Sequence, residues 1–181
     1  DVVMHSSDTE TIYVSAASGG IYKSADKGKT WNQIFENHNT LSIGDLAIAE
    51  TDKNLIYVGT GEPNIGQGSV TYDGYGVFKS SDAGETWEHA GLENAGGIGR
   101  VEIDPENPQR VFVAALGNIF TKNPERGVYR TLDGGESWEN VLFISDSTGC
   151  IDLCMDTQNT DIIYAAMWER VRFPHSPSPV P

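Results

Sequence analysis

The apolar residues of the chain fall in short runs, and none of these runs repeats with the spacing of an amphipathic helix. A triplet of strand-forming residues occurs four times, at residues 12–14, 56–58, 111–113 and 163–165. A second apolar segment precedes each triplet, at residues 2–4, 46–48, 101–103 and 153–155. Turn-forming residues such as Asp and Asn separate the two segments of each pair. The pattern predicts antiparallel strand pairs joined by tight turns.

A motif of eight residues follows three of these pairs. It reads Ser/Thr-x-Asp-x-Gly-x-Ser/Thr-Trp and occurs at residues 24–31, 80–87 and 131–138. A third strand is predicted just before each motif, and a fourth strand begins at each tryptophan. The tryptophans recur 56 and then 51 residues apart. A four-stranded unit that repeats at this period without helices is typical of a β-propeller blade.

The sequence therefore predicts an all-β fold, a partial β-propeller of about three and a half four-stranded blades. We label the strands of each blade A to D. The predicted blades span about residues 1–38, 39–93, 94–144 and 145–172, and the last of them contains only strands A and B. Residues 173–181 are rich in Pro and Ser and are interpreted as a tail or linker.

The conserved spacing within the eight-residue motif has a structural explanation. An Asp carboxylate caps backbone N–H groups in a tight turn, and Gly accepts a positive φ angle there. The Trp then buries a large apolar surface between neighbouring strands. Because a motif present in every blade is a poor candidate for a single active site, we assign its residues a structural role. They are Asp26, Gly28, Trp31, Asp82, Gly84, Trp87, Asp133, Gly135 and Trp138.

A ligand site is expected at one rim of the propeller. Strand A lines the central channel, and the D–A and B–C loops share a rim opposite the eight-residue turns. The B–C loops at residues 61–74 and 116–127 are long, and long loops on a rigid scaffold often bind ligands. The A strands begin with four equivalent residues at the mouth of the channel. These residues are Asp1, Asp45, Arg100 and Asp152.

This ring is interpreted either as a polar ligand site or as a solvated channel lining. Asp45 and Asp152 are the candidate catalytic residues. Trp168, just past strand B of the fourth blade, is either a platform for a sugar or an interface, or a residue that the remainder of blade four covers. The candidate ligand-binding residues of the rim are Glu62, Asn64, Tyr72, Asp73, Arg100, Asn118, Arg126, Trp168 and Glu169.

Composition and charge exclude several classes of function. The chain has 26 acidic and 12 basic residues, and a net charge of −14 argues against a nucleic-acid partner. No apolar run approaches the roughly 18 residues needed to cross a membrane, so membrane insertion is not expected. The four histidines are scattered over different blades, which argues against a metal site. A Gly-x-Gly at residues 59–61 precedes no predicted helix, so no nucleotide or other cofactor is expected.

The two cysteines, Cys150 and Cys154, lie four residues apart in a predicted strand. Such residues face the same side of a strand about 13 Å apart, which is too far for a disulfide. We expect both to be buried free thiols.

The eight-residue motifs resemble those of the Asp-box (BNR-repeat) propellers. This group includes sialidases, xyloglucan-cleaving glycoside hydrolases, sortilin-type domains and photosystem assembly factors. The resemblance is greatest to large bacterial sortilin-like proteins of the BNR-repeat glycosyl hydrolase group, at residues 59–64, 97–100, 114–117 and 165–170. It covers residues 1 to about 172. It implies a propeller with more blades and an extracytoplasmic (secreted or periplasmic) location.

Two functions are compared. The favoured hypothesis is a sortilin-like module that binds a glycan or peptide at the rim. The alternative is a glycoside hydrolase of the xyloglucanase type, which needs two carboxyl groups about 5 to 9.5 Å apart. In the xyloglucan-cleaving enzymes that the chain resembles, these carboxylates come from separate propellers.

A sialidase is less favoured, because a third arginine and the Tyr–Glu nucleophile have no match, and an assembly factor stays open. At the open edge of the fourth blade we expect either further blades or a second chain as a partner.

Overall fold

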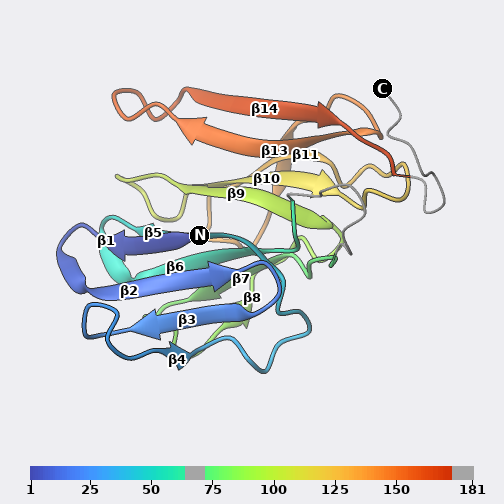
Figure 1. Ribbon diagram of the computed structural model, residues 1–181. Helices are drawn as coiled ribbons and strands as arrows, with labels where there is room; N and C mark the ends of the chain where they lie inside the picture. Colours follow the sequence, from blue (N-terminus) through green and yellow to red (C-terminus); the bar gives the residue numbers. More distant parts are fainter. Residues whose placement is uncertain (64–71, 173–181) are drawn as a thin grey trace.

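The computed structural model describes residues 1–63 and 72–172, and in these residues every regular element is a β-strand (Figure 1). The first sheet contains β1 (Val2–His5), β2 (Asp8–Ala16), β3 (Gly20–Ser24) and β4 (Asn32–Gln33). The second contains β5 (Ile43–Ala49), β6 (Asp52–Thr60), β7 (Val77–Ser80) and β8 (Glu88–His89). The third contains β9 (Gly97–Ile103), β10 (Val111–Gly117), β11 (Gly127–Thr131) and β12 (Glu139–Leu142). The fourth contains β13 (Thr148–Met155) and β14 (Ile163–Glu169).

Each sheet is an antiparallel meander in which strands pair in chain order. The first strands of adjacent sheets, β1, β5, β9 and β13, contact one another in that order. Figure 1 shows the result, a set of sheets side by side with β13 and β14 at one end and the first sheet at the other. The fold is therefore a partial β-propeller, as the sequence predicts. We number its sheets as blades one to four.

The hydrophobic core consists of layers between adjacent blades. Tyr13 and Ile21 of blade one pack with Ile56 and Phe78 of blade two. Equivalent layers lie between blades two and three and between blades three and four. A blade thus buries its faces against its neighbours, because a single small sheet cannot bury both faces alone. None of the described residues belongs to a helix with the length and apolarity needed to span a membrane.

The inner strands of blades two, three and four share a β-bulge. It falls between Ile43 and Asp45 in β5, between Ile98 and Arg100 in β9, and between Cys150 and Asp152 in β13. Each bulge adds one residue, and the residue in β5 is Gly44. A Cβ atom on Gly44 would lie 1.9 Å from the carbonyl oxygen of Ile98, so the bulge lets the inner strands approach closely.

The bulge in β13 corrects one expectation from the sequence. Cys150 is buried, but Cys154 is exposed, and both are free thiols. An extra residue in a strand reverses the face of every side chain beyond it, so the two cysteines do not share a face. Burial raises the pKa of the Cys150 thiol to about 11.

Residues 24–31, 80–87 and 131–138, the eight-residue motifs, form one repeated structure that we call the box turn. In the second box turn the Asp82 carboxylate accepts hydrogen bonds from the Thr86 N–H (2.8 Å) and the Thr86 hydroxyl (2.6 Å). The Ser80 hydroxyl donates to Asp82 (2.8 Å) and accepts from the Gly84 N–H (2.8 Å). The same bonds recur in the other two turns. The aspartate thus holds the turn closed around the glycine.

Each box tryptophan except the first reaches into the preceding blade. The indole N–H of Trp87 donates to the carbonyl of Ile34 (2.9 Å), and that of Trp138 donates to the carbonyl of Ala90 (2.6 Å). Trp31, in blade one, instead donates to Gly28 of its own turn (3.1 Å) and is 40% exposed. Trp87 and Trp138 therefore make contacts between blades rather than within one.

We predict that Trp138→Ala costs about 3 kcal/mol of unfolding free energy, because it removes a large side chain from the layer between two blades and a partly buried hydrogen bond. Trp31→Ala is the matched control, and it should cost less than about 1 kcal/mol because Trp31 is 40% exposed and its indole donates within its own turn. Urea denaturation followed by circular dichroism measures both. Equal costs for the two substitutions would contradict the inter-blade role.

The box aspartates also predict a dependence of stability on pH. Hydrogen bonds from Thr86 and Ser80 lower the pKa of Asp82 to about 2, from an ordinary value of 3.8. A lowered folded-state pKa stabilises the fold above the ordinary value, and this stabilisation is lost as the pH falls through about 2.

Asp82→Asn should therefore flatten the loss of stability between pH 4 and pH 2, measured by the urea midpoint at each pH. Glu106→Gln, an exposed carboxylate outside the box turns, is the control and should leave the profile unchanged. If the urea midpoint of Asp82→Asn falls as steeply between pH 4 and pH 2 as that of the natural protein, Asp82 does not cause the acid-dependent loss of stability.

Candidate functional site

The inner strands of the blades line a cleft of about 520 Å³, which we call the axial cleft. It lies at the three β-bulges, where the backbones approach closely and the side chains that follow each bulge face the cleft. The bulges bring three of the four predicted channel residues together, and the fourth, Asp1, also lines the cleft. The lining residues are Asp1, Gly44, Asp45, Pro63, Gly99, Arg100, Ile151, Asp152 and Ala166.

Arg100 connects the two candidate catalytic aspartates. Its Nε donates to Asp152 Oδ1 (2.8 Å), and its Nη1 lies 3.5 Å from Asp45 Oδ1. The other oxygen of Asp45 accepts the backbone N–H of Val101 (2.7 Å). One guanidinium and one peptide group therefore hold the inner strands of blades two, three and four in register.

The two aspartates differ in their access to a ligand. Asp45 is 4% exposed and has both oxygens engaged, whereas 55% of the Asp152 side chain is exposed. Among the described residues, no hydrogen bond is made to Asp152 Oδ2. Burial raises the pKa of Asp45, against the opposing effects of the Val101 N–H and the Arg100 charge. Asp45 thus holds Arg100 in position, and Asp152 and Arg100 are the groups in the cleft that are accessible to a ligand.

The cleft presents a hydrogen-bond acceptor beside a donor. Asp152 offers a carboxylate oxygen, and Arg100, with 39% of its side chain exposed, offers guanidinium N–H groups. The hydrogen bond to Asp152 raises the pKa of Arg100, so the guanidinium keeps its charge. This arrangement suits neutral polar ligands with neighbouring hydroxyl groups, each of which donates and accepts.

A second hollow of about 340 Å³ lies between the B–C loops of blades two and three. Asp73 and Asn118 both line it, and the Asn118 amide lies 3.5 Å from Asp73 Oδ2. Tyr72 is 51% exposed, and its carbonyl accepts the N–H of Glu62 (3.1 Å). The loops thus bring four of the predicted rim residues into two adjacent pairs. Asn64, also predicted at the rim, lies outside the described residues.

Sequence reasoning missed other residues that line the second hollow. They are Glu93, Asn94, Gly96, Thr121 and Asn123. Glu93 and Asn94 belong to the D–A connection, which the topology does place at this rim. No short motif marks them.

Arg126 does not face a ligand, contrary to the expectation from the sequence. Its side chain is completely buried, and burial lowers its pKa. Nη2 donates to the carbonyls of Asn118 (2.7 Å) and Thr121 (3.0 Å). Nη1 donates to the carbonyls of Ser147 (3.3 Å) and Arg170 (3.1 Å). Arg126 therefore joins the B–C loop of blade three to blade four, which the sequence could not indicate because loop arginines are usually exposed.

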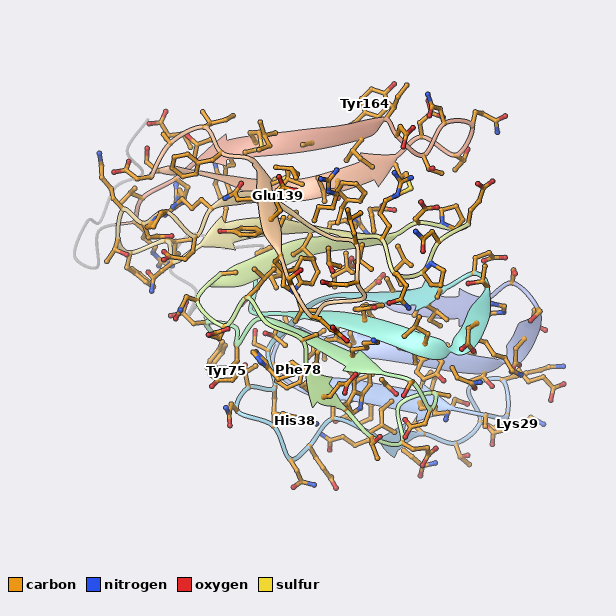
Figure 2. The ribbon with its side chains drawn as sticks, turned by 180° about the vertical axis from the view of Figure 1, so that it is seen from behind. Lys29, His38, Tyr75, Phe78, Glu139 and Tyr164 are labelled. Carbon is orange, nitrogen blue, oxygen red and sulfur yellow. The ribbon has the colours of Figure 1, made fainter. Side chains whose placement is uncertain are left out.

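Trp168 belongs to strand β14 rather than lying past it, which corrects the prediction. The guanidinium of Arg170 lies over its ring, 5.3 Å from the centroid. Side chains four apart in a strand share a face, so Trp168 lies on the same face as Tyr164, which is 61% exposed. Glu169 is exposed and accepts a hydrogen bond from Ser147 (3.3 Å). Figure 2 shows Tyr164 at the outer end of the stacked sheets.

We predict that Arg126→Met costs about 3 kcal/mol or more of unfolding free energy, because it removes four hydrogen bonds from one charged donor that join the B–C loop of blade three to blade four. Lys122→Met, in the same loop, is the matched control. Lys122 is largely exposed and pairs with Asp146 at 3.7 Å, so its loss should cost less than about 1 kcal/mol. Thermal denaturation compares the two variants. A stable Arg126→Met variant would show that the loop does not depend on this side chain.

Comparison with known proteins places this geometry among β-propellers. No protein-family model matches the chain. A xyloglucanase from Paenibacillus sp is 27% identical over 143 residues, which are 74% of this chain and 13% of that protein. The xyloglucanase Xgh74A of Acetivibrio thermocellus is 25% identical over 144 residues, again 74% of this chain and 16% of that protein. The chain therefore spans about one seventh of the length of these curated relatives.

Two solved structures show the fold. The crystal structure of an ancestral GH74 enzyme matches with a TM-score of 0.71 and 21% identity, over 91% of this chain and 21% of that one. The structure of YCF48 bound to D1 peptide matches with a TM-score of 0.53 and 12% identity, over 96% of this chain and 54% of that one.

Proposed function

We propose that this chain is part of a glycoside hydrolase-like protein and that its axial cleft binds a neutral polysaccharide of the xyloglucan type. The observation that supports this most is the Arg100–Asp152 pair, which is held by Asp45 and partly exposed in the cleft. The two xyloglucanases align with 74% of the chain, which is in keeping with a glycan as its ligand.

The charge of the chain favours a neutral glycan over an acidic one. A net charge of −14 repels polyanions, whereas it does not affect a polymer that carries only hydroxyl groups. Sugar hydroxyls donate to the free oxygen of Asp152 and accept from Arg100. Because a polysaccharide does not cross a membrane, we also propose that the protein acts outside the cytoplasm.

Cleavage requires more than this cleft provides. Hydrolysis of a glycosidic bond needs two carboxyl groups that both reach the substrate. Asp45 is buried with both oxygens engaged, so Asp152 is the one member of the predicted pair that can touch a sugar. We therefore assign binding to this chain, and its second carboxyl group for catalysis would come from another part of the protein.

A peptide ligand is the second candidate. YCF48, which shares the fold, is bound to D1 peptide in its structure, and a sortilin-like role would also place a peptide at the rim. An arginine beside a carboxylate can bind a peptide as well as a sugar. Binding assays with a glycan and with a peptide therefore distinguish the two ligands, and Arg100→Ala tests whether the cleft is responsible.

We predict that xyloglucan in a native gel retards the chain and that Arg100→Ala weakens this binding at least tenfold, because it removes the donor and releases Asp152. The matched control is Lys29→Ala. Lys29 lies in the first box turn. Figure 2 shows Lys29 at the opposite end of the sheets from Tyr75, which follows the B–C loop of blade two. Lys29→Ala should bind as the natural chain does.

Three results would change the proposal. Absence of retardation by xyloglucan and other neutral glucans would exclude glycan binding. Binding to a peptide array that Arg100→Ala abolishes would assign the cleft to peptides. Release of reducing sugar by the chain alone, lost in Asp152→Asn, would show that it cleaves its ligand without a second carboxylate from elsewhere.

A further inference from the structure

A third hollow, of about 300 Å³, lies between blades one and two, and we call it the outer hollow. It extends from β4, the outer strand of blade one, to the second box turn. Both of the blades that form it have all four strands. Its lining residues are Gln33, Ile34, Glu36, Asn37, His38, Gly84, Glu85, Thr86 and Trp87.

Two of the rings that line the outer hollow pack on one buried phenylalanine. Phe35 is completely buried, and the His38 ring stacks on it with the ring centroids 4.1 Å apart. Trp87 meets Phe35 edge to face at 5.3 Å. Phe78 of blade two lies 5.1 Å from the His38 ring, and Figure 2 shows both at the end of the sheets opposite Lys29. The imidazole is therefore held by two phenylalanine rings.

His38 has hydrogen-bonding groups that no described neighbour uses. The residue is partly buried, and among the described residues no hydrogen bond is made to either ring nitrogen. Burial lowers the pKa of His38, so near pH 7 the ring is neutral and offers one N–H donor and one acceptor nitrogen. The Asn37 side chain, which also lines the hollow, likewise makes no hydrogen bond within the described part of the chain. A partly buried polar group without a partner costs desolvation free energy, and a bound ligand can compensate for it.

The other blades show that the propeller repeat does not require these side chains. Phe35 and His38 are the fourth and seventh residues after the box tryptophan of blade one. In blades two and three, these positions are occupied in turn by Gly91, Asn94, Leu142 and Ser145. The contact between a box turn and the preceding blade therefore forms without an imidazole on a phenylalanine. The outer hollow is a feature of the first interface and not of the repeat.

We propose that the outer hollow is a second glycan site, which binds one neutral sugar residue against Trp87 and His38. The class of ligand rests on the proposed function, whereas the site rests on the residues of the hollow. Sugar hydroxyl groups exchange hydrogen bonds with His38 and Asn37, because each of these side chains both donates and accepts. An apolar face of the sugar ring packs on the indole of Trp87.

The charges around the hollow favour a neutral sugar over a charged ligand. Glu36 lines the hollow and is exposed, so it repels acidic sugars. Glu85 pairs with Lys23 at 3.3 Å, which weakens its attraction for a cationic ligand. The remaining polar groups of the lining are amides, a hydroxyl and a neutral imidazole. Such groups match a ligand that carries hydroxyls and no charge.

The outer hollow and the axial cleft share no residue, so they act as separate sites. A xyloglucan polymer that reaches both sites is held by two contacts, and its affinity then exceeds that of either site alone. Loss of one contact, as in Arg100→Ala, weakens retention of the polymer. A short oligosaccharide reports on each site by itself.

A xyloglucan oligosaccharide of one repeat unit therefore serves as the probe. Titration calorimetry of the 181-residue chain should show two molecules bound per chain. His38→Phe keeps a flat ring on Phe35 but removes both nitrogens, so it should leave the Tm unchanged and reduce the number of sites to one. His89→Ala is the matched control, because His89 packs on Phe78 (5.2 Å) but does not line the hollow, and it should still bind two molecules.

Asn37→Ala gives a second test, in a residue that is exposed and makes no side-chain hydrogen bond within the described part of the chain. It should weaken the outer site at least fivefold without a change in Tm. Arg100→Ala should remove the other site and leave the outer one, and the double variant Arg100→Ala/His38→Phe should bind no oligosaccharide.

The outcomes separate this proposal from that of the axial cleft. A single site that Arg100→Ala removes and His38→Phe does not would overturn the outer site and leave the cleft standing. A single site that only His38→Phe removes would support the outer site and overturn the cleft. Two sites that both persist in His38→Phe would also overturn the outer site, as would binding of an arginine-containing peptide, in place of the sugar, that His38→Phe abolishes.

Discussion

The carbonyl group that follows each box aspartate organises the contacts between blades. Its residue has a positive φ angle in all three turns, 61° at Lys27, 59° at Ala83 and 72° at Gly134. This conformation is costly for a residue with a side chain, and the hydrogen bonds of the aspartate maintain it. In the second and third turns, the carbonyls of Ala83 and Gly134 then point toward the preceding blade, where each accepts hydrogen bonds from a tyrosine and a lysine. Without that closed turn, neither the indole nor the carbonyl would reach the neighbouring sheet.

The axial cleft depends on a different local feature, the bulge in the inner strands of blades two, three and four. Gly44 and Gly99 lack a side chain where the next inner strand passes, and this allows Arg100 to lie between Asp45 and Asp152. The exposed pair in the cleft is therefore supported from below by a buried carboxylate. Such support fixes the orientation of a guanidinium, which lowers the entropy that a ligand must remove when it binds.

The two ends of the blades, one with the box turns and one with the B–C loops, consequently have different roles. The end with the box turns joins blades through backbone carbonyls, and its polar residues are largely used within the turns. The other end presents the axial cleft and the hollow around Asp73 and Asn118. Arg126 lies beneath that second hollow and holds its loop to blade four through carbonyl groups. A buried charge without a carboxylate partner is tolerated there because four peptide dipoles surround it.

The sequence by itself determined the repeat, the strand order within a blade and the positions of the turns. These follow from local causes, namely the spacing of strand formers and the chemistry of Asp, Gly and Trp in a tight turn. It also placed Asp45, Arg100 and Asp152 at equivalent points, because the repeats align. Only the tertiary structure decided which of these side chains stays exposed, that Arg126 is buried and that Cys154 is not. Those outcomes depend on single-residue bulges and on the packing of loops between blades. One added residue in a strand reverses the face of the side chains after it, and no sequence pattern marks the position of such a bulge.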